Sequence, residues 1–206
     1  MKYKHHECTG NNCVECKAYN TDHTGRRNLA RKEYSTDKEK AEKKEKDRLY
    51  YSLDLQKVRM LPEIPGSKST VFTQRICAYN ETFSPVGKRV GDSYAILWHQ
   101  GIKGRNDEDI TSAVVKFLVK LHCDLKEITI WMDNCTAQNK NWTIFSALVR
   151  VMNMPKLLNI EMITLKYFEK GHSFMSADSF HHRVERQCKR ERNLYDFNDF
   201  VSCVKN

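Results

Sequence analysis

Three aspartates stand where this sequence could carry out phosphate chemistry. Asp133 follows an apolar run and opens the polar segment 134–141, whereas Asp54 interrupts a strand-like stretch. Asp178 lies shortly after the tripeptide Gly-His-Ser at 171–173, near the start of a helical pattern. Because α/β sheets carry reactive groups at the carboxyl ends of their strands, carboxylates in the order strand, strand, helix suggest a magnesium site. The structural alternative is that Asp133 only caps the helix that follows it.

Two further side chains compete for a place in this site. Glu185 lies two helical turns after Asp178, so the sequence leaves open which of them is the third acid; Glu185 could equally pair with a neighbouring arginine. His172 could orient a water or a phosphate or donate to a carboxylate, or it could be a turn histidine that bonds to backbone. The amides that could bind phosphate, orient the nearby acid or cap a helix are Asn134, Gln138 and Asn139.

The N-terminal segment, residues 1–24, is dense in cysteine and histidine and predicts a zinc site. Two cysteines in a C-x-x-C pair can hold one zinc ion at tetrahedral angles, and a downstream histidine can add a third ligand. The predicted ligands are Cys8, Cys13, Cys16 and His23. His6 is the alternative to the first of these, and a reduced arm without metal is the alternative to the whole site.

Residues 25–48 contain almost no large apolar side chains and predict an exposed, charged helical spacer. Glu39 stands four residues before Lys43, and Glu42 stands four before Lys46. Each such pair supports a solvated helix by a few tenths of a kcal/mol. The functional alternative is a basic helix that grips a phosphate backbone, and the interleaved glutamates weigh against it.

Residues 49–206 have the apolar periodicity of one folded domain. Their pattern predicts strands over 50–61, 71–79, 94–98, 128–133 and 160–168, and helices over 108–122, 142–152 and 177–190. The order βββαβαβα suits an α/β fold with a mixed five-stranded sheet and helices packed on it.

The excess of positive charge favours a polyanionic partner. Lys and Arg outnumber Asp and Glu by 35 to 26, a formal charge of +9, which suits DNA. No run of 18 apolar residues is present, so the sequence predicts no membrane span. The first residues lack the apolar core of a signal peptide, so we expect a nuclear or cytoplasmic protein that is not secreted. The eight cysteines should then be reduced or bound to metal.

Four stretches of the sequence form a specific combination. They are Ser-Leu-Asp-Leu-Gln-Lys-Val at 52–58, Trp-His-Gln-Gly at 98–101, Trp-Met-Asp-Asn-Cys-Thr-Ala-Gln-Asn-Lys-Asn at 131–141 and Gly-His-Ser-Phe-Met-Ser-Ala-Asp-Ser-Phe at 171–180. With the element order, they resemble a family of transposon-derived proteins of unknown function that carry a DDE-transposase-like core of the ribonuclease H-like fold. The resemblance covers 49–200, and the Cys/His segment looks like the short zinc-binding stretch that precedes the core in that family.

The resemblance implies a role for each acid. Asp54 on the first strand and Asp133 at the end of the fourth would flank two Mg²⁺ or Mn²⁺ ions, and Asp178 would complete the site from the last helix. Integrase-like enzymes often use a glutamate on this helix, so Glu185 remains an alternative to Asp178 as the third acid. Two such ions stabilise the attacking and leaving oxygens of an in-line phosphoryl displacement, here DNA cleavage or strand transfer.

The resemblance also implies that the protein acts as a homo-oligomer, as transposases usually do. The alternative is a domesticated, catalytically silent module that binds nucleic acid or protein through the same fold. No helix-turn-helix for transposon ends is recognisable, so we expect DNA contact to be non-specific and sensitive to salt.

Overall fold

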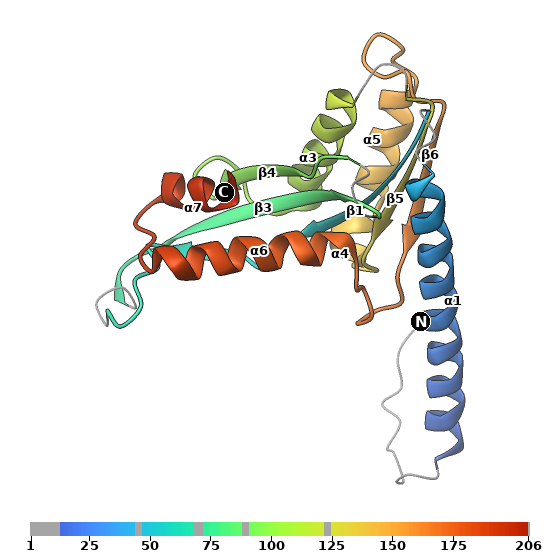
Figure 1. Cartoon of the computed structure of the whole chain (residues 1–206), viewed down its shortest axis with the longest axis horizontal. Helices are drawn as coiled ribbons and strands as arrows, with labels where there is room; N and C mark the ends of the chain where they lie inside the picture. Colours follow the sequence, from blue (N-terminus) through green and yellow to red (C-terminus); the bar gives the residue numbers. More distant parts are fainter. Residues whose placement is uncertain (1–12, 44–46, 68–71, 88–90, 122–124, 206) are drawn as a thin grey trace.

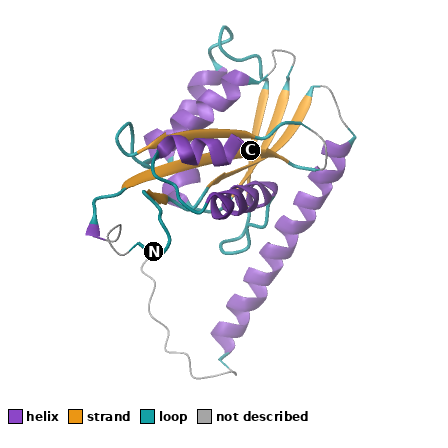
Figure 2. Cartoon of the chain, turned by 60° about the vertical axis from the view of Figure 1, so that its left-hand side comes forward, coloured by secondary structure: helices purple, strands orange, loops and turns teal. Residues whose placement is uncertain are grey.

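The sheet and the helices on both of its faces form one body. A computed structural model describes residues 13–43, 47–67, 72–87, 91–121 and 125–205. They form a mixed six-stranded sheet with flanking helices (Figures 1 and 2), so the predicted α/β class is confirmed. None of the helices in these ranges is long and apolar enough to cross a membrane.

Strand β1 is the centre of the sheet, since it pairs antiparallel with β3 on one side and parallel with β5 on the other. The strands are β1 (Arg48–Leu55), β2 (Arg59–Leu61), β3 (Ile76–Pro85), β4 (Tyr94–His99), β5 (Glu127–Met132) and β6 (Met162–Tyr167). β6 extends the sheet in parallel beyond β5, and β4 lies on the far side of β3. Ala78 of β3 pairs with Arg59 on one side and with His99 on the other, so β2 lies on the β1 side. The strand predicted over 50–61 is therefore two strands.

Helices pack on both faces of the sheet (Figure 1). They are α1 (Val14–Glu42), α3 (Asp107–Lys120), α4 (Thr136–Asn139), α5 (Trp142–Met152), α6 (Ser176–Glu191) and α7 (Phe197–Lys205). Leu53 of β1 points to the first face, where it joins Phe117 of α3 and Ile144 of α5. Tyr50 points to the second face and joins Trp131 of β5 in a cluster beneath α1 and the start of α6.

Sequence periodicity found the regular elements of the second half of the chain. α3, β5, α5, β6 and α6 all lie within two residues of their predicted bounds. Two asparagines fix the helix starts, because the side chain of Asn106 accepts the Asp109 N–H at 2.9 Å and that of Asn141 accepts the Ile144 N–H at 3.0 Å.

Two elements were misplaced or missed. β3 lies further along the chain than the strand predicted over 71–79, because its centre, 80–82, is polar although it is buried. No helix was predicted over α7, which begins at a turn where Asp196 accepts the N–H groups of Asn198 and Asp199. α7 packs on α6 through Phe200.

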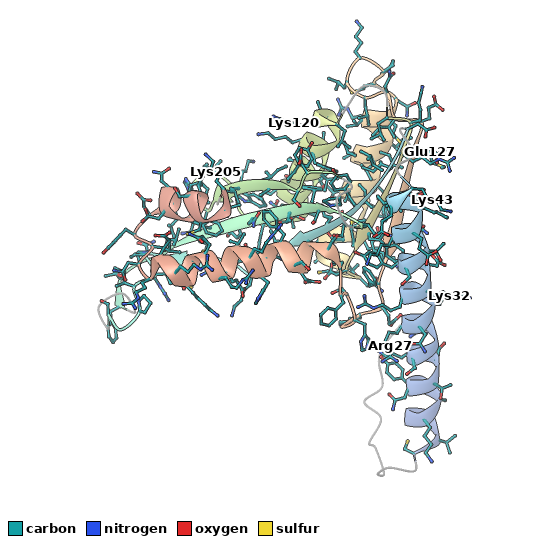
Figure 3. All side chains as sticks on the ribbon, viewed as in Figure 1. Arg27, Lys32, Lys43, Lys120, Glu127 and Lys205 are labelled. Atoms are coloured by element: carbon teal, nitrogen blue, oxygen red, sulfur yellow. The ribbon has the colours of Figure 1, made fainter. Side chains whose placement is uncertain are left out.

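Helix α1 joins the predicted zinc segment to the predicted spacer. It has 29 residues and runs through the boundary expected at 24/25. Exposed cations such as Lys32 and Lys43 are spread along it (Figure 3), as the spacer prediction requires. The helix is nevertheless docked on the sheet, because Ala41 is buried in the second core and Asp37 is only 2% exposed.

Asp37 anchors α1 to the edge of the sheet. Its Oδ2 accepts the indole N–H of Trp131 at 3.0 Å and pairs with the Lys166 ammonium at 2.8 Å. The ammonium also lies 5.3 Å from the centroid of the Trp131 ring. A buried carboxylate with both a hydrogen bond and a counter-ion is stabilising only as a complete set.

Asp37→Ala should lower the free energy of unfolding by about 2–3 kcal/mol, because the Trp131 N–H loses its acceptor and Lys166 keeps only the more exposed Glu33 as counter-ion. Urea denaturation at pH 7 measures the change. The control is Glu39→Ala on the exposed side of the same helix, which should change stability by less than about 0.5 kcal/mol. An equally small effect of Asp37→Ala would show that α1 docks without this contact.

Candidate metal centre

Asp54 and Asp133 are neighbours because of the register between two strands. Leu53 of β1 pairs in parallel with Met132 of β5, and the next residue on each chain is an aspartate. Adjacent strands lie roughly 4.8 Å apart, so both acids emerge side by side at the carboxyl edge of the sheet. Parallel strands of α/β proteins usually present their ligand sites at this edge.

The start of helix α6 brings a third acid to the same edge. Ser52 of β1 fixes that start, because its hydroxyl accepts the Ala177 N–H at 2.9 Å and lies 2.7 Å from the Ser176 hydroxyl. Asp178 closes the first turn by accepting the Met175 N–H at 2.8 Å. Since Ser52 lies two residues before Asp54, the first turn of α6 is held against the strand that carries Asp54.

Asp54, Asp178 and His181 form a group that could hold a metal ion. Their nearest ligand atoms all lie within 4.8 Å of one another, and Asp54 Oδ2 is 3.5 Å from His181 Nδ1. Asp178 and His181 are one helical turn apart, so both side chains lie on the face of α6 that meets β1. The sequence did not predict His181, although its spacing of three residues from Asp178 was visible.

Burial makes this group electrostatically unusual. It raises the pKa of Asp54 to about 7, and the neighbouring charges of Asp133 and Asp178 push in the same direction. Burial also lowers the pKa of His181 to about 4, so the imidazole is neutral at pH 7 and a lone pair is free for a cation. Large pKa shifts that arise from burial and from a neighbouring charge are typical of functional sites.

Asp133 is held by the polar segment that follows it. The Asn139 side-chain amide donates to Asp133 Oδ1, and the Cys135 N–H lies 3.4 Å from the same oxygen. Asn139 is itself fixed, because its carbonyl accepts the Tyr167 hydroxyl at 2.8 Å. The aspartate is therefore oriented by its neighbours, and the amide role proposed for the 134–141 segment falls on Asn139.

Glu81 is a fourth acid that sequence reasoning missed. It is 1% exposed, and neither carboxyl oxygen has a hydrogen-bond partner among the described residues. Burial raises its pKa well above the usual range, and the charges of Asp54 and Asp133 add to the shift. Its neighbours Tyr79 and Phe83 face α3, so Glu81 lies on the opposite side of the sheet from the group with His181. The only warning in the sequence was the run Asn-Glu-Thr at 80–82 inside an apolar strand.

Asp133 borders the group without belonging to it, and two other predicted residues lie apart from it within the described structure. Glu185 is half-buried on α6, one turn beyond His181, and does not belong to the cluster of ligand atoms. His172 lies in the loop before α6, and its ring nitrogen Nε2 is 3.0 Å from that of His23.

The predicted zinc ligands are only partly described. Cys8 and the alternative His6 lie outside the described residues, as does the side chain of Cys16. Cys13 caps α1, and His23 lies ten residues further along the same helix. At 1.5 Å per residue this is roughly 15 Å, so Cys13 and His23 are not ligands of a common ion in this conformation.

Comparison of the chain with protein-family models, with curated proteins and with solved structures found no match.

Metal binding to Asp54 should depend on pH. The pKa of Asp54 is higher in the folded state than its ordinary 3.8, so its contribution to stability is full at low pH and is lost as the pH rises through about 7. A cation binds the ionised carboxylate and therefore competes with the proton below pH 7. Manganese should raise the melting temperature more at pH 8 than at pH 6.5. His181 is neutral at both values, so its titration does not contribute.

Differential scanning calorimetry with and without 1 mM Mn²⁺, roughly the concentration needed for an open carboxylate site, measures this difference. Asp54→Asn should abolish the manganese effect at both pH values. The control is Glu161→Gln, which removes the same charge just before β6, at the opposite end of the parallel strands. This variant should keep the full effect of manganese on the melting temperature. Equal stabilisation at pH 6.5 and 8 would contradict a role for Asp54.

Proposed function

We propose that this protein is a transposase-derived DNA-processing protein whose acid centre cleaves or transfers DNA phosphodiesters with Mg²⁺ or Mn²⁺. The observation that carries the proposal is that Asp54 and Asp178 belong to one compact group at an edge of a mixed sheet, with Asp133 beside Asp54 on the adjacent parallel strand. The strand order and the flanking helices are compatible with the ribonuclease H-like fold implied by the sequence resemblance.

The donor set suits a divalent cation and favours manganese over magnesium. Carboxylates are the ligands preferred by Mg²⁺ and Mn²⁺, whereas a neutral imidazole such as His181 suits transition metals. The group of Asp54, Asp178 and His181 is compact enough for one ion. Asp133, on the neighbouring strand, lies outside this group and would be a ligand of a second ion. When bound, such ions stabilise the attacking and leaving oxygens of a phosphoryl displacement.

A basic groove beside the acid centre offers a path for the DNA strand. It has a volume of about 890 Å³ and opens between α1 and α6, with Asp178 in its wall. Lys38 of α1 and Arg183 and Arg186 of α6 supply positive charge for phosphates. Phe174, which is 79% exposed at the same groove, offers a flat surface on which a base can stack.

The catalytic form of the proposal is tested by nicking of supercoiled plasmid in Mn²⁺. Asp133→Asn should reduce the rate by about a thousandfold or more, since the metal-bound transition state is stabilised by several kcal/mol. Glu161→Gln is the matched control and should nick like the unmodified protein. Nicking that survives Asp133→Asn in a preparation free of contaminating nuclease would refute the catalytic proposal.

The groove itself favours a second candidate, a catalytically silent module that binds nucleic acid. Its cations lie outside the acid centre, so they would bind phosphates whether or not the acids act on them. Under this candidate the protein binds DNA through Arg183 and Arg186 and shows no metal-dependent nicking.

Both candidates predict a salt-dependent contact with DNA in the groove. The double variant Arg183→Glu, Arg186→Glu should weaken binding at every sequence and reduce the slope of log K against log salt by about 2. The control reverses the same number of charges at Lys116 and Lys120 on α3, the helix that covers the opposite face of the sheet (Figure 1). A gel-shift salt series measures both, and equal slopes for the two variants would place the DNA elsewhere.

A further inference from the structure

A second cluster of ligand-type side chains joins α1 to the loop between β6 and α6. His23 of α1 lies between two partners, with its Nδ1 3.1 Å from Glu169 Oε1 and its Nε2 3.0 Å from His172 Nε2. The two imidazole rings are tilted by 51° with centroids 5.0 Å apart, so they meet through their nitrogen atoms rather than by stacking. None of these residues belongs to the acid centre.

Glu169 determines which nitrogen of His23 carries the proton. Arg26 donates through Nε to Glu169 Oε2 at 2.9 Å, and this bond, helped by His23, lowers the pKa of Glu169 and keeps it ionised. An ionised carboxylate only accepts hydrogen bonds, so the His23 nitrogen that faces it, Nδ1, bears the hydrogen. In the neutral His23 ring, Nε2 then carries no hydrogen, and its lone pair points toward His172.

The loop between β6 and α6 holds His172 in contact with His23. Arg31 of α1 donates to the carbonyl oxygens of His172, at 2.7 Å, and of Phe174. The His172 N–H donates to the Glu169 carbonyl at 3.0 Å, in a turn that continues through Gly171 at φ +78°. Both histidines are half-buried, so their rings have limited freedom to rotate apart.

We propose that His23 and His172 bind a zinc-type transition-metal ion through their Nε2 atoms, with Glu169 as the carboxylate that orients His23. Two nitrogens at 2.0–2.1 Å from zinc lie roughly 3.3 Å apart at a tetrahedral angle, close to the 3.0 Å between these atoms. A metal-bound histidine almost always donates its other N–H to a carboxylate or a carbonyl, and His23 faces such a carboxylate in Glu169.

This site differs from the one expected from the cysteines, because it joins two distant parts of the chain, 23 and 172, across the α1 interface. Two protein ligands leave further positions open to water, so the site should be weaker than a four-ligand structural zinc site. Its effect would be to clamp α1 onto the loop that leads into Asp178. The simpler arrangement of the same atoms is a direct hydrogen bond between the two rings, without a metal.

Isothermal titration of the full chain with Zn²⁺ separates these arrangements. His172→Gln and His23→Gln should each remove one zinc site or weaken it at least tenfold. Glu169→Gln should weaken it by about 10- to 100-fold, as expected for a carboxylate behind a ligand histidine. His182→Gln, on the exposed side of α6, is the matched control and should bind zinc like the unmodified chain.

His172→Gln is the decisive variant, because a site made by Cys8, Cys13, Cys16 and His23 would survive it. Zinc should also raise the melting temperature of the unmodified chain and of His182→Gln more than that of His172→Gln. Unchanged zinc affinity and stoichiometry in His172→Gln, with an unchanged circular dichroism spectrum, would overturn the proposal. If His172→Gln is poorly folded, Glu169→Gln decides by the same criterion, because Glu169 is not a ligand of the cysteine site.

Discussion

The parallel pairing of β1 with β5 is the constraint from which the acid centre follows. Because Leu53 and Met132 share one register position, Asp54 and Asp133 must emerge together. A shift by one residue would turn one of these acids to the opposite face of the sheet. The apolar side chains on both strands make such a shift costly, since either Leu53 of β1 or Ile130 and Met132 of β5 would leave the core. Core packing thus fixes the distance between two charges that repel each other.

That repulsion makes the centre costly to the folded state. Asp54 is half-buried and Glu81 is buried, both with raised pKa values, and Glu81 has no hydrogen-bond partner in the described structure. The anchoring of α1 offsets part of this cost, because the buried carboxylate of Asp37 has a close cation in Lys166. The two aspartates have opposite surroundings. Asp37 has a donor and a close cation, whereas Asp54 lies beside the like charges of Asp133 and Asp178.

The sequence predicted those parts of the structure that depend on local patterns. Helical periodicity found α3, α5 and α6, and the apolar run before Asp133 found β5, because these elements bury one continuous face. The local pattern could not identify Glu81, because the burial of a polar residue in β3 depends on strands and helices that are far away in the sequence. His181 was missed because its neighbour His182 is equally well spaced, and only the packing of α6 on β1 shows which one faces Asp54. The docking of α1 rests on a few contacts in a charged helix, which no periodicity reveals.

The position of α1 shows what the acid centre needs from a part of the chain that contributes no acid to it. Arg31 and Tyr34 reach from this helix to the loop and to Ser176 at the start of α6, just ahead of Asp178. A fragment that begins at Leu49 would retain all the acids but lose the brace that holds this turn. Truncation of the chain before β1 would therefore loosen the acid centre while leaving each of its acids in place. A count of acids in a shortened sequence would then overstate how well the centre is formed.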